Sequence, residues 1–257
     1  MELSSALKAW RLLAAAFASM ALSLPCVAAD LLVWSAGAAK APLEELSLQF
    51  EKVAHKALQV EYAPVGVLLR RLGEGTQPDV LILSAEVVAE VERKGWSVAG
   101  SALALGSVGV GIAVKEGAAQ PDISTPDALR KTLLAARNIT YMDPQKGTSG
   151  KHFAAVLEQL GIEQQVKAKT TLGDIGFVVE PVARGEIELG VQQITEILPV
   201  KGARLLGPLP ASLQKITTYS VMLGTQARDP ALASSLINYL TSAQAAVVFR
   251  QKGFSVP

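Results

Sequence analysis

Short apolar segments alternate with amphipathic helical segments along this chain, and this alternation strongly limits the folds that it can adopt. In the first part of the chain, three predicted strands are each followed by a predicted helix: 31–34 then 42–53, 58–62 then 67–72, and 79–84 then 87–94. Strands and helices repeating at this spacing are typical of parallel βαβ units. The apolar run Val80–Leu83 fits a strand that is covered on both faces. The sequence therefore predicts an α/β fold with a largely parallel sheet.

Two longer strand patterns, at residues 107–114 and 217–223, stand on either side of a middle block of shorter elements. In that block and in the tail, the predicted elements are a helix that opens at 125, a strand at 138–142, a helix from 148 to about 160, a helix at 174–184, a strand at 188–192, and helices at 229–240 and 242–251. This order predicts two α/β lobes joined by two crossings, with the last helices returning to the first lobe. We expect residues 30–111 and 216–257 to form lobe 1 and residues 112–215 to form lobe 2.

The first 29 residues have the layout of a secretory signal peptide. A short basic region with Lys8 and Arg11 precedes the apolar run Leu12–Leu24, and small residues follow up to Ala29. The apolar run is shorter than the about 20 residues that are needed to span a bilayer. We expect cleavage after about Ala29 and export to the periplasm. The only cysteine, Cys26, would leave with the signal, so packing rather than disulfides would stabilise the mature chain.

Charge and composition exclude several classes of function. The formal net charge of +1 falls to zero once the predicted signal is removed, because Lys8, Arg11 and Glu2 are removed with it. A neutral chain argues against nucleic acid or a membrane surface as partner, since both select basic patches. Two histidines and a lone cysteine exclude a structural zinc site. We expect no metal and no cofactor.

Small residues gather at three predicted turns between a strand and a helix: residues 36–39, 147–150 and 173–175. In open α/β sheets such turns lie beyond the carboxyl ends of the strands, where ligands bind. Uncovered N–H groups at a helix start attract anions, because the helix dipole places about half a positive charge there. Several such turns around one crevice would form an anion site with little formal charge. The alternative is that glycine and serine serve here only to turn and cap the chain.

Five segments resemble, in order and spacing, the periplasmic molybdate-binding proteins of ABC transporters and the wider type II solute-binding family: LLVWSAGA, PDVLILSA, DPQKGTSGKH, VARGEIELGVQQITEILPV and LTSAQAAVVFRQKGF. The resemblance covers essentially all of the chain after the predicted signal. It implies a type II periplasmic binding protein fold in which two lobes close on a small anion. It also implies delivery of that anion to a membrane permease. We expect a monomer, because two moving lobes need free surfaces.

The chain departs from the molybdate-binding pattern at three positions that would supply hydroxyl groups. Ala38 stands where the family has a serine after the first strand, and Gly66 lies in the turn that would carry a second serine. Gln193 replaces an expected tyrosine. Ala38 and Gly66 can offer only backbone N–H groups to an anion. The ligand therefore stays open between an oxyanion such as molybdate or tungstate and a di- or tricarboxylate.

The predicted ligand contacts combine these backbone turns with nearby cations and amides. We predict contacts from Gly37, Ala38, Gly66, Val67, Arg70, Ser149, Gly150, Lys151, Ile175 and Gln193. A guanidinium pairs bidentately with a carboxylate, which makes Arg70 and its neighbour Arg71 candidates. The alternative for both arginines is a solvated helix face. Lys151 at a helix start is mildly unfavourable for the helix dipole, which favours a ligand role over a surface role.

Two functions from different classes fit these residues. The first is an exported receptor of an ABC-type importer, which binds a small anion without chemistry and demands least of the residues. The alternative is a periplasmic aconitate isomerase, an activity found among proteins that resemble the molybdate binders. That reaction needs a base that moves a proton along an allylic system. The predicted catalytic residues in that case are His152, which titrates near neutrality, and Glu196.

Overall fold

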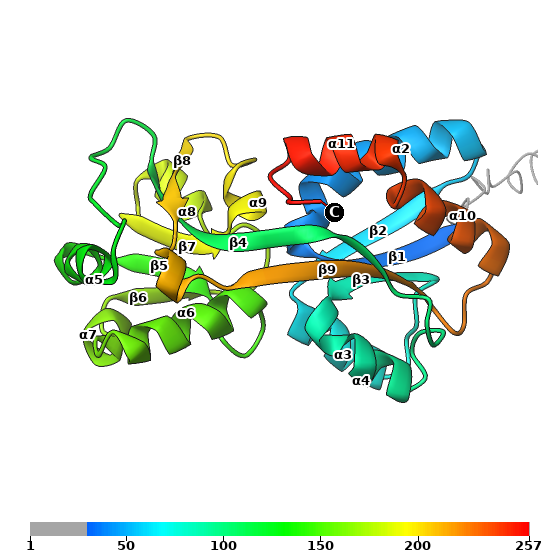
Figure 1. Cartoon of the computed structure of the whole chain (residues 1–257), viewed down its shortest axis with the longest axis horizontal. Coiled ribbons are helices and arrows are strands. Elements are labelled where there is room, and N and C mark those ends of the chain that lie inside the picture. The colour runs from blue at the N-terminus through cyan, green and yellow to red at the C-terminus, as the bar shows by residue number, and fades with distance from the viewer. Residues whose placement is uncertain (1–29, 257) are drawn as a thin grey trace, which may run out of the picture.

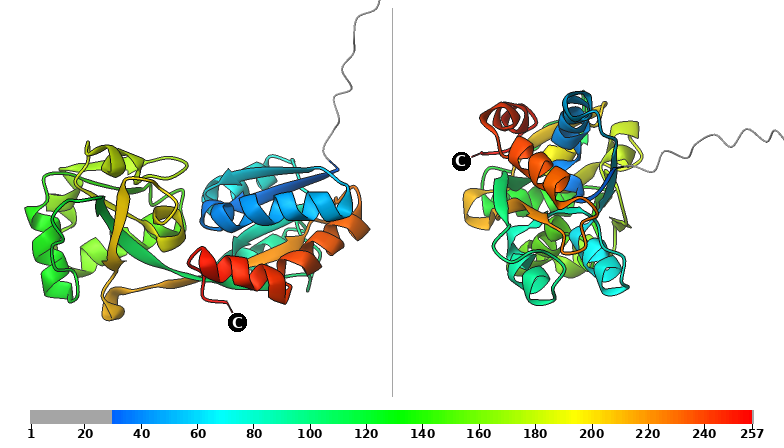
Figure 2. Two further views of the ribbon diagram at one scale, coloured as in Figure 1. Left: turned by 90° about the horizontal axis from the view of Figure 1, so that it is seen from above. Right: turned by 90° about the vertical axis from the view of Figure 1, so that its right-hand side faces the viewer.

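The computed structural model describes residues 30–256, so the predicted signal peptide and Cys26 lie outside the described residues. Two α/β lobes lie side by side along the long axis of the described chain (Figure 1; Figure 2). Two long strands, β4 (Leu103–Lys115) and β9 (Ile216–Leu223), run between the lobes. They pair antiparallel with each other. The prediction of two lobes joined by two crossings is confirmed.

Lobe 1 contains the part of the sheet with strand order β2-β1-β3-β9-β4. The strands β1 (Leu31–Ala36), β2 (Leu58–Ala63) and β3 (Val80–Ser84) are parallel, as the alternation of strands and helices predicts. The helices α2 (Lys40–Ala54) and α11 (Ala243–Gln251) lie above this sheet in Figure 1, and α10 (Pro230–Leu240) lies at its right-hand end. The helices below it are α3 (Val65–Gly73) and α4 (Val88–Arg93). Short 3-10 helices precede α2 and α4, at Gly37–Ala39 and Ala85–Val87.

Lobe 2 continues the sheet from β4 in the order β7-β5-β6, and β8 pairs with β4 off this path. Its strands are β5 (Ile139–Met142), β6 (Thr170–Gly173), β7 (Leu189–Gln193) and β8 (Ala203–Pro208). Its helices are α5 (Pro126–Ala135), α6 (Thr148–Gln159), α7 (Glu163–Lys167), α8 (Glu180–Arg184) and α9 (Ile194–Ile197), with a 3-10 helix at Ala211–Leu213. The strand β5 is parallel to both β6 and β7, so this lobe is also built from βαβ units.

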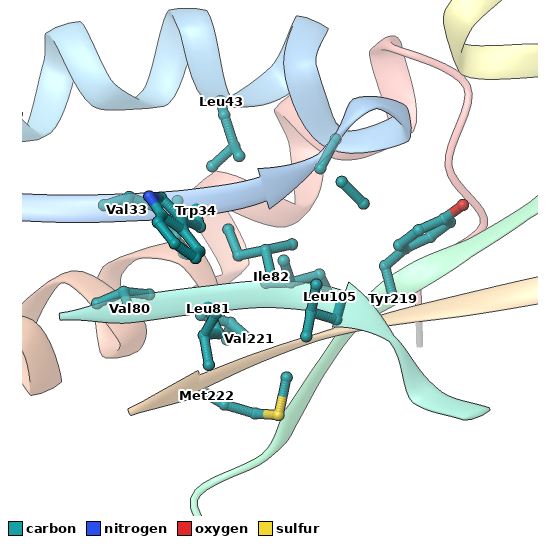
Figure 3. Packing of buried hydrophobic residues seen from close by; sticks show 14 of the residues in the cluster. Val33, Trp34, Leu43, Val80, Leu81, Ile82, Leu105, Tyr219, Val221 and Met222 are labelled. Carbon is teal, nitrogen blue, oxygen red and sulfur yellow. The ribbon is translucent and has the colours of Figure 1, made fainter. Parts of the chain in front are cut away.

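Each lobe has its own apolar core. The first core collects side chains from residues 31–108 and 219–254, and Figure 3 shows Leu43 and Ile82 among them. Lobe 2 contains two clusters, a larger one from residues 110–213 and a smaller one from residues 113–200. Tyr219 lies at the edge of the first core, with its hydroxyl directed away from the labelled aliphatic side chains (Figure 3). We propose that residues 30–111 and 216–257 form lobe 1 and that residues 112–215 form lobe 2.

Within residues 30–256, no single helix is long and apolar enough to cross a membrane, although α10 and α11 pass that test when taken together across their 59° bend. Apolar side chains of both helices pack on the core of lobe 1.

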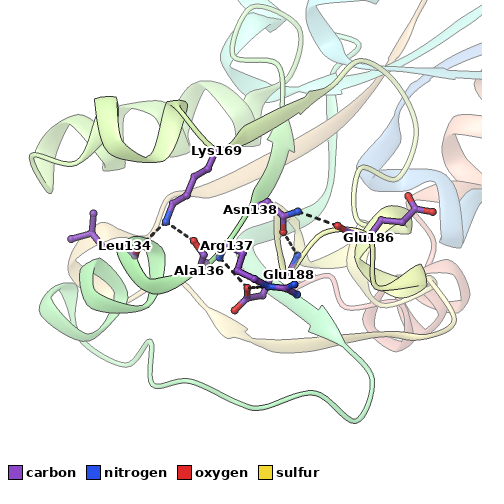
Figure 4. Close-up of polar contacts among 7 residues, drawn as sticks. All are labelled: Leu134, Ala136, Arg137, Asn138, Lys169, Glu186 and Glu188. Atoms are coloured by element: carbon purple, nitrogen blue, oxygen red, sulfur yellow. Dashed lines mark hydrogen bonds and ion pairs between the residues drawn. The ribbon is translucent and has the colours of Figure 1, made fainter.

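Polar contacts join the starts of the lobe 2 strands. Asn138 accepts the backbone N–H of Glu188 at 2.8 Å and donates to the carbonyl of Glu186 at 3.0 Å (Figure 4). Lys169, just before β6, donates to two backbone carbonyls at the end of α5. These bonds tie the amino ends of β5, β6 and β7 together. The carboxyl ends of these strands lie at the opposite edge of the sheet. There Met142, the last residue of β5, lines a cavity.

The predicted helix at 174–184 is wrong in its first half, because only Glu180–Arg184 is helical. Gly176 has φ +75°, a left-handed conformation that interrupts a right-handed helix. Residues 174–179 therefore form a loop, and Ile175 lies on that loop rather than at a helix start. The sequence patterns also missed β6, β8 and the short helix α9, each of which has six residues or fewer.

Candidate functional site

A cavity of about 270 Å³ lies between the two lobes. Lobe 1 contributes the end of β1, the start of α2, the segment from β2 into α3, and β9. Lobe 2 contributes the end of β5, the start of α6, the loop after β6, and α9. The lining residues are Ala36, Gly37, Ala38, Lys40, Tyr62, Ala63, Pro64, Val65, Met142, Gly147, Thr148, Ser149, Ile175, Gly176, Phe177, Glu196 and Tyr219.

The helix starts that line this cavity have no side-chain cap. The 3-10 turn that leads into α2, the start of α3 and the start of α6 all lack one. Among the described helices that contribute no lining residue, α5, α10 and α11 are capped by the side chains of Thr125, Asp229 and Ser242, whereas α4, α7 and α8 have no side-chain cap. At the start of α3 the N–H groups of Gly66 and Val67 bond to backbone carbonyls instead. At the turn into α2 and at the start of α6, uncapped backbone N–H groups can attract an anion. The arrangement supports the sequence-based expectation of an anion site at the turns 36–39 and 147–150.

The two lobes touch directly at the edge of this cavity. The backbone N–H of Gly66, in the first turn of α3, donates to the carbonyl of Lys146 in lobe 2 at 2.9 Å. A Cβ atom at Gly66 would lie 3.0 Å from the carbonyl oxygens of both Gln145 and Lys146. The backbones of the two lobes can approach this closely because residue 66 has no side chain.

Glu196 is the one carboxyl group in the lining of the described cavity, and it is only 7% exposed. Burial raises its pKa to about 8, although hydrogen bonds from the side chain of Gln192 and the backbone of Gln193 oppose that rise. No cation contributes to this shift. Its Oε1 lies 2.6 Å from where a Cβ of Gly37 would stand, so the carboxyl lies against the first turn of lobe 1. At neutral pH this group is mostly protonated.

Lys40 is the one basic side chain among the described residues that line the cavity. Its Nζ lies 4.9 Å from the centre of the Phe177 ring, across the cavity mouth in lobe 2, and 5.8 Å from the Tyr62 ring. It also lies 3.8 Å from Glu44 on the same helix. Because the lysine side chain is 34% exposed, its contact with Glu44 is weak and its ammonium group can turn toward a ligand.

Hydroxyl groups from both lobes meet at the cavity wall. The hydroxyl of Tyr219, from β9, lies 3.3 Å from that of Thr148 at the start of α6. Gln193, behind them on β7, donates from its side-chain nitrogen to both hydroxyls at 3.3 Å. The oxygen of the same Gln193 amide is buried without a partner. Burial raises the pKa values of Tyr219 and Tyr62, so both phenols remain protonated donors.

The structure brings some of the predicted site residues together. Gly37, Ala38, Ser149, Ile175 and Glu196 all line the cavity. Gln193 lies directly behind it and holds Thr148 and Tyr219.

Other predicted residues lie outside this lining. Arg70 is 64% exposed and lies 3.7 Å from Glu74. The N–H groups of Gly66 and Val67 are both bonded to backbone carbonyls, and Lys151 is exposed to solvent. These positions do not form part of the cavity wall.

The same is true of Gly150, Arg71 and His152. Gly150 packs against the carbonyl of Met142, where a Cβ atom would overlap it. Arg71 pairs with Glu61 at 3.2 Å. His152 makes a 2.8 Å hydrogen bond between its Nε2 and the Leu213 carbonyl.

Lining residues that are absent from the predicted ligand contacts include Lys40, Tyr62, Thr148, Phe177 and Tyr219. Lys40 directly follows the selected turn 36–39 and Thr148 lies within the selected turn 147–150, so the signal was present for both. Tyr62 and Tyr219 lie on strands, and no local pattern shows that these strands border a cavity.

Comparison with known proteins identifies the family. The family model for bacterial extracellular solute-binding proteins matches residues 31–255. The chain belongs to this family. An aconitate isomerase from Pseudomonas sp. is 30% identical over 90% of this chain and 91% of that protein. The molybdate-binding protein ModA of Azotobacter vinelandii is 25% identical over 91% of this chain and 93% of that protein.

The fold agrees with this assignment. The solved structure of the Azotobacter vinelandii periplasmic molybdate-binding protein matches with a TM-score of 0.74 and 18% identity, covering 88% of this chain and 99% of that chain. The resemblance inferred from the sequence segments and the two-lobed type II fold are therefore confirmed.

Proposed function

We propose that this chain is an exported, periplasmic solute-binding protein that holds a small anion between its lobes and delivers it to an ABC-type importer. The observation that carries the proposal is the cavity between the lobes, with uncapped helix starts from both lobes and Lys40 in its wall. Backbone N–H groups and a single cation bind an anion without requiring a catalytic group. Membership of the solute-binding family supports the same role.

The chemistry of the cavity favours an organic acid as the anion. The cavity of about 270 Å³ is close to the lower end of the range of about 300–1,000 Å³ that small-molecule pockets have, so it has room for an organic acid as well as for a tetrahedral oxyanion. Alanine, valine, isoleucine, methionine and aromatic side chains form much of the wall. An oxyanion gains little from such a wall, whereas the carbon skeleton of an organic acid gains from burial against it.

A thermal-shift screen of the purified protein tests this proposal. The probes are molybdate, tungstate, sulfate, citrate, both aconitates and a set of monocarboxylates. A ligand at 100 times its Kd stabilises the protein by about 2.7 kcal/mol, which corresponds to a rise in Tm on the order of 5–10 °C for a domain pair of this size. We expect an organic acid to give the largest rise. The receptor proposal fails if no anion shifts the Tm.

A matched pair of lysine variants places the binding in the cavity. Lys40→Met should reduce the shift strongly, because it removes the cation from the wall. Lys52→Met, on the exposed end of the same helix, should leave the shift unchanged. Equal shifts in both variants would show that the anion binds elsewhere.

A second candidate function is the isomerisation of cis- and trans-aconitate. The observation that favours it is Glu196, a buried carboxyl in the cavity wall whose pKa of about 8 suits a base that removes and returns a proton near neutral pH. The aconitate isomerase relative supports it further. In this reaction Glu196 takes a proton from one carbon of the allylic system and returns it to the other, so no further reactant is needed.

Ultraviolet absorbance of trans-aconitate, followed in the presence of the protein, decides between the two functions. The isomerase predicts turnover that rises with pH up to about 8 and is lost in Glu196→Gln. His152→Ala should keep full activity, because His152 lies outside the cavity wall and bonds to Leu213. Absence of turnover in the wild-type protein removes this candidate.

A further inference from the structure

Glu196 shares one wall of the cavity with the backbone turn that begins at Gly37. The carboxyl oxygen Oε1 lies so close to this turn that a Cβ on Gly37 would be 2.6 Å away. No side chain caps the turn. An anion held by the N–H groups of this turn would therefore lie next to the Glu196 carboxyl. The charge of that carboxyl must then influence which anions bind.

The titratable side chains around Glu196 are few. Among the described lining residues they are Lys40 from the start of α2, Tyr62 from β2 and Tyr219 from β9. The neighbouring strand β7 contributes only the amides of its two glutamines, and β4 and β8 contribute no lining residue. Both tyrosines stay neutral. Among the described lining residues, only Lys40 and Glu196 therefore set the charge. The carboxylate of Glu44 lies just outside the lining, 3.8 Å from Lys40 Nζ, and it is 60% exposed, so solvent weakens its effect.

We propose that Glu196 acts as a protonated hydrogen-bond donor to the bound anion and makes the cavity selective for organic acids with one negative charge. This inference rests on the proposed receptor function and names the class of its ligand. A protonated Glu196 leaves one positive charge, on Lys40, to balance one carboxylate. A second carboxylate on the ligand would find no cation among the described lining residues. The largely apolar wall then contacts the uncharged part of the ligand.

The proposal fixes the direction of the pH dependence. A ligand that accepts a hydrogen bond from protonated Glu196 stabilises that form, so binding raises its pKa further. Affinity should therefore be constant below the pKa of the free protein, which is about 8, and should fall above it. From pH 7 to pH 9 the Kd should rise about tenfold, because only about a tenth of the carboxyl groups remain protonated at pH 9.

Isothermal titration tests the ligand class and the role of Glu196 together. The probes are benzoate, phenylacetate and 4-methyl-2-oxopentanoate as monoanions, with succinate, citrate, trans-aconitate and molybdate as competitors of higher charge. We expect one monoanion to bind at least about tenfold more tightly than any competitor at pH 7. Tightest binding of a polyanion would overturn the inference.

Variants at position 196 separate proton donation from packing. Glu196→Gln keeps a donor of nearly the same shape but cannot ionise, so its Kd should stay flat from pH 6 to pH 9. Glu196→Asp keeps an ionisable carboxyl and should keep the rise in Kd at high pH. Glu158→Gln, at an exposed position on α6, should behave as the wild-type protein does. A rise in Kd that persists in Glu196→Gln would show that another group titrates, and the inference would fail.

The same measurements distinguish failure of this inference from failure of the receptor proposal. If anions bind in the cavity but the charge selectivity or pH profile differs, the receptor proposal survives and the role of Glu196 does not. If no probe gives binding heat or a thermal shift, both fail together.

Discussion

Replacing Gly66 by alanine should weaken ligand binding without weakening the fold. Gly66 is the second residue of α3 in lobe 1, and its N–H donates across the cavity edge to Lys146 of lobe 2 at 2.9 Å. A methyl group there would stand 3.0 Å from two backbone carbonyl oxygens of lobe 2, a few tenths of an ångström closer than ordinary contact. Those carbonyls belong to the main chain, so the lobes themselves must move apart.

The magnitude follows from the two contacts that are disturbed. Overpacking of this kind costs about 1–3 kcal/mol, and a strained hydrogen bond loses up to about 1 kcal/mol. Both costs fall on the state in which the lobes touch. A net loss of about 1–2 kcal/mol raises the Kd about 5- to 30-fold. Within lobe 1 alone, alanine in a helix is favoured over glycine by up to about 1 kcal/mol, so the ligand-free Tm should stay level or rise.

The assay combines isothermal titration, using the anion with the largest thermal shift, with the Tm of the ligand-free variant. Gly73→Ala is the matched control at the other end of α3, because a Cβ there would meet only the Trp96 ring at 3.9 Å. It should leave the affinity unchanged. Unchanged affinity in Gly66→Ala, or a fall in ligand-free Tm that accounts for the lost affinity, would refute this reasoning.

Three further outcomes follow from the contacts described above. Tyr219→Phe removes the hydroxyl that meets Thr148 across the lobes, and urea unfolding should show a loss of about 1 kcal/mol together with weaker ligand binding. Asp79→Asn should lower the free energy of unfolding by about 2 kcal/mol or more. The carboxylate of Asp79 is only 2% exposed, and the substitution removes its ion pair with Arg228. Burial raises the pKa of Asp79 but its hydrogen bonds lower it more, so the stability that it contributes should be lost only as the pH falls below 3.8. Glu196 binds its proton more tightly in the folded state, so the ligand-free protein should lose stability as the pH rises from 4.5 to about 8. In Glu196→Gln this loss of stability should be absent when thermal unfolding is measured over the same pH range.

Most of the fold could be predicted from local patterns. A strand that is buried on both faces needs apolar side chains on both, so an apolar run such as Val80–Leu83 predicts a central strand. The parallel pairing of β1 with β3 follows from the helices that connect these strands. The helix expected at 174–184 failed because Gly176 takes a left-handed conformation, which the sequence allows but does not require. Short elements such as α9 carry too few residues to show a period.

Local sequence patterns predicted only part of the candidate site. The turns at 36–39 and 147–150 were selected by their small residues, and both line the cavity. The choice of cations was poorer, since Arg70 and Lys151 lie near the right turns in sequence but their side chains lie outside the cavity wall. Which face of a helix meets the cavity depends on how the two lobes sit together, and no local pattern contains that information. The side chain of Lys40 lines the cavity, whereas that of Arg70 does not.

A crystal structure of the protein grown with the anion that gives the largest thermal shift is the most direct test of an anion site between the lobes. We predict electron density for the anion in the cavity, within hydrogen-bond distance of the backbone N–H groups of Gly37 or Ala38 and of the start of α6, with Glu196 beside it. An anion bound outside this cavity, with the uncapped turns filled only by water, would contradict the account.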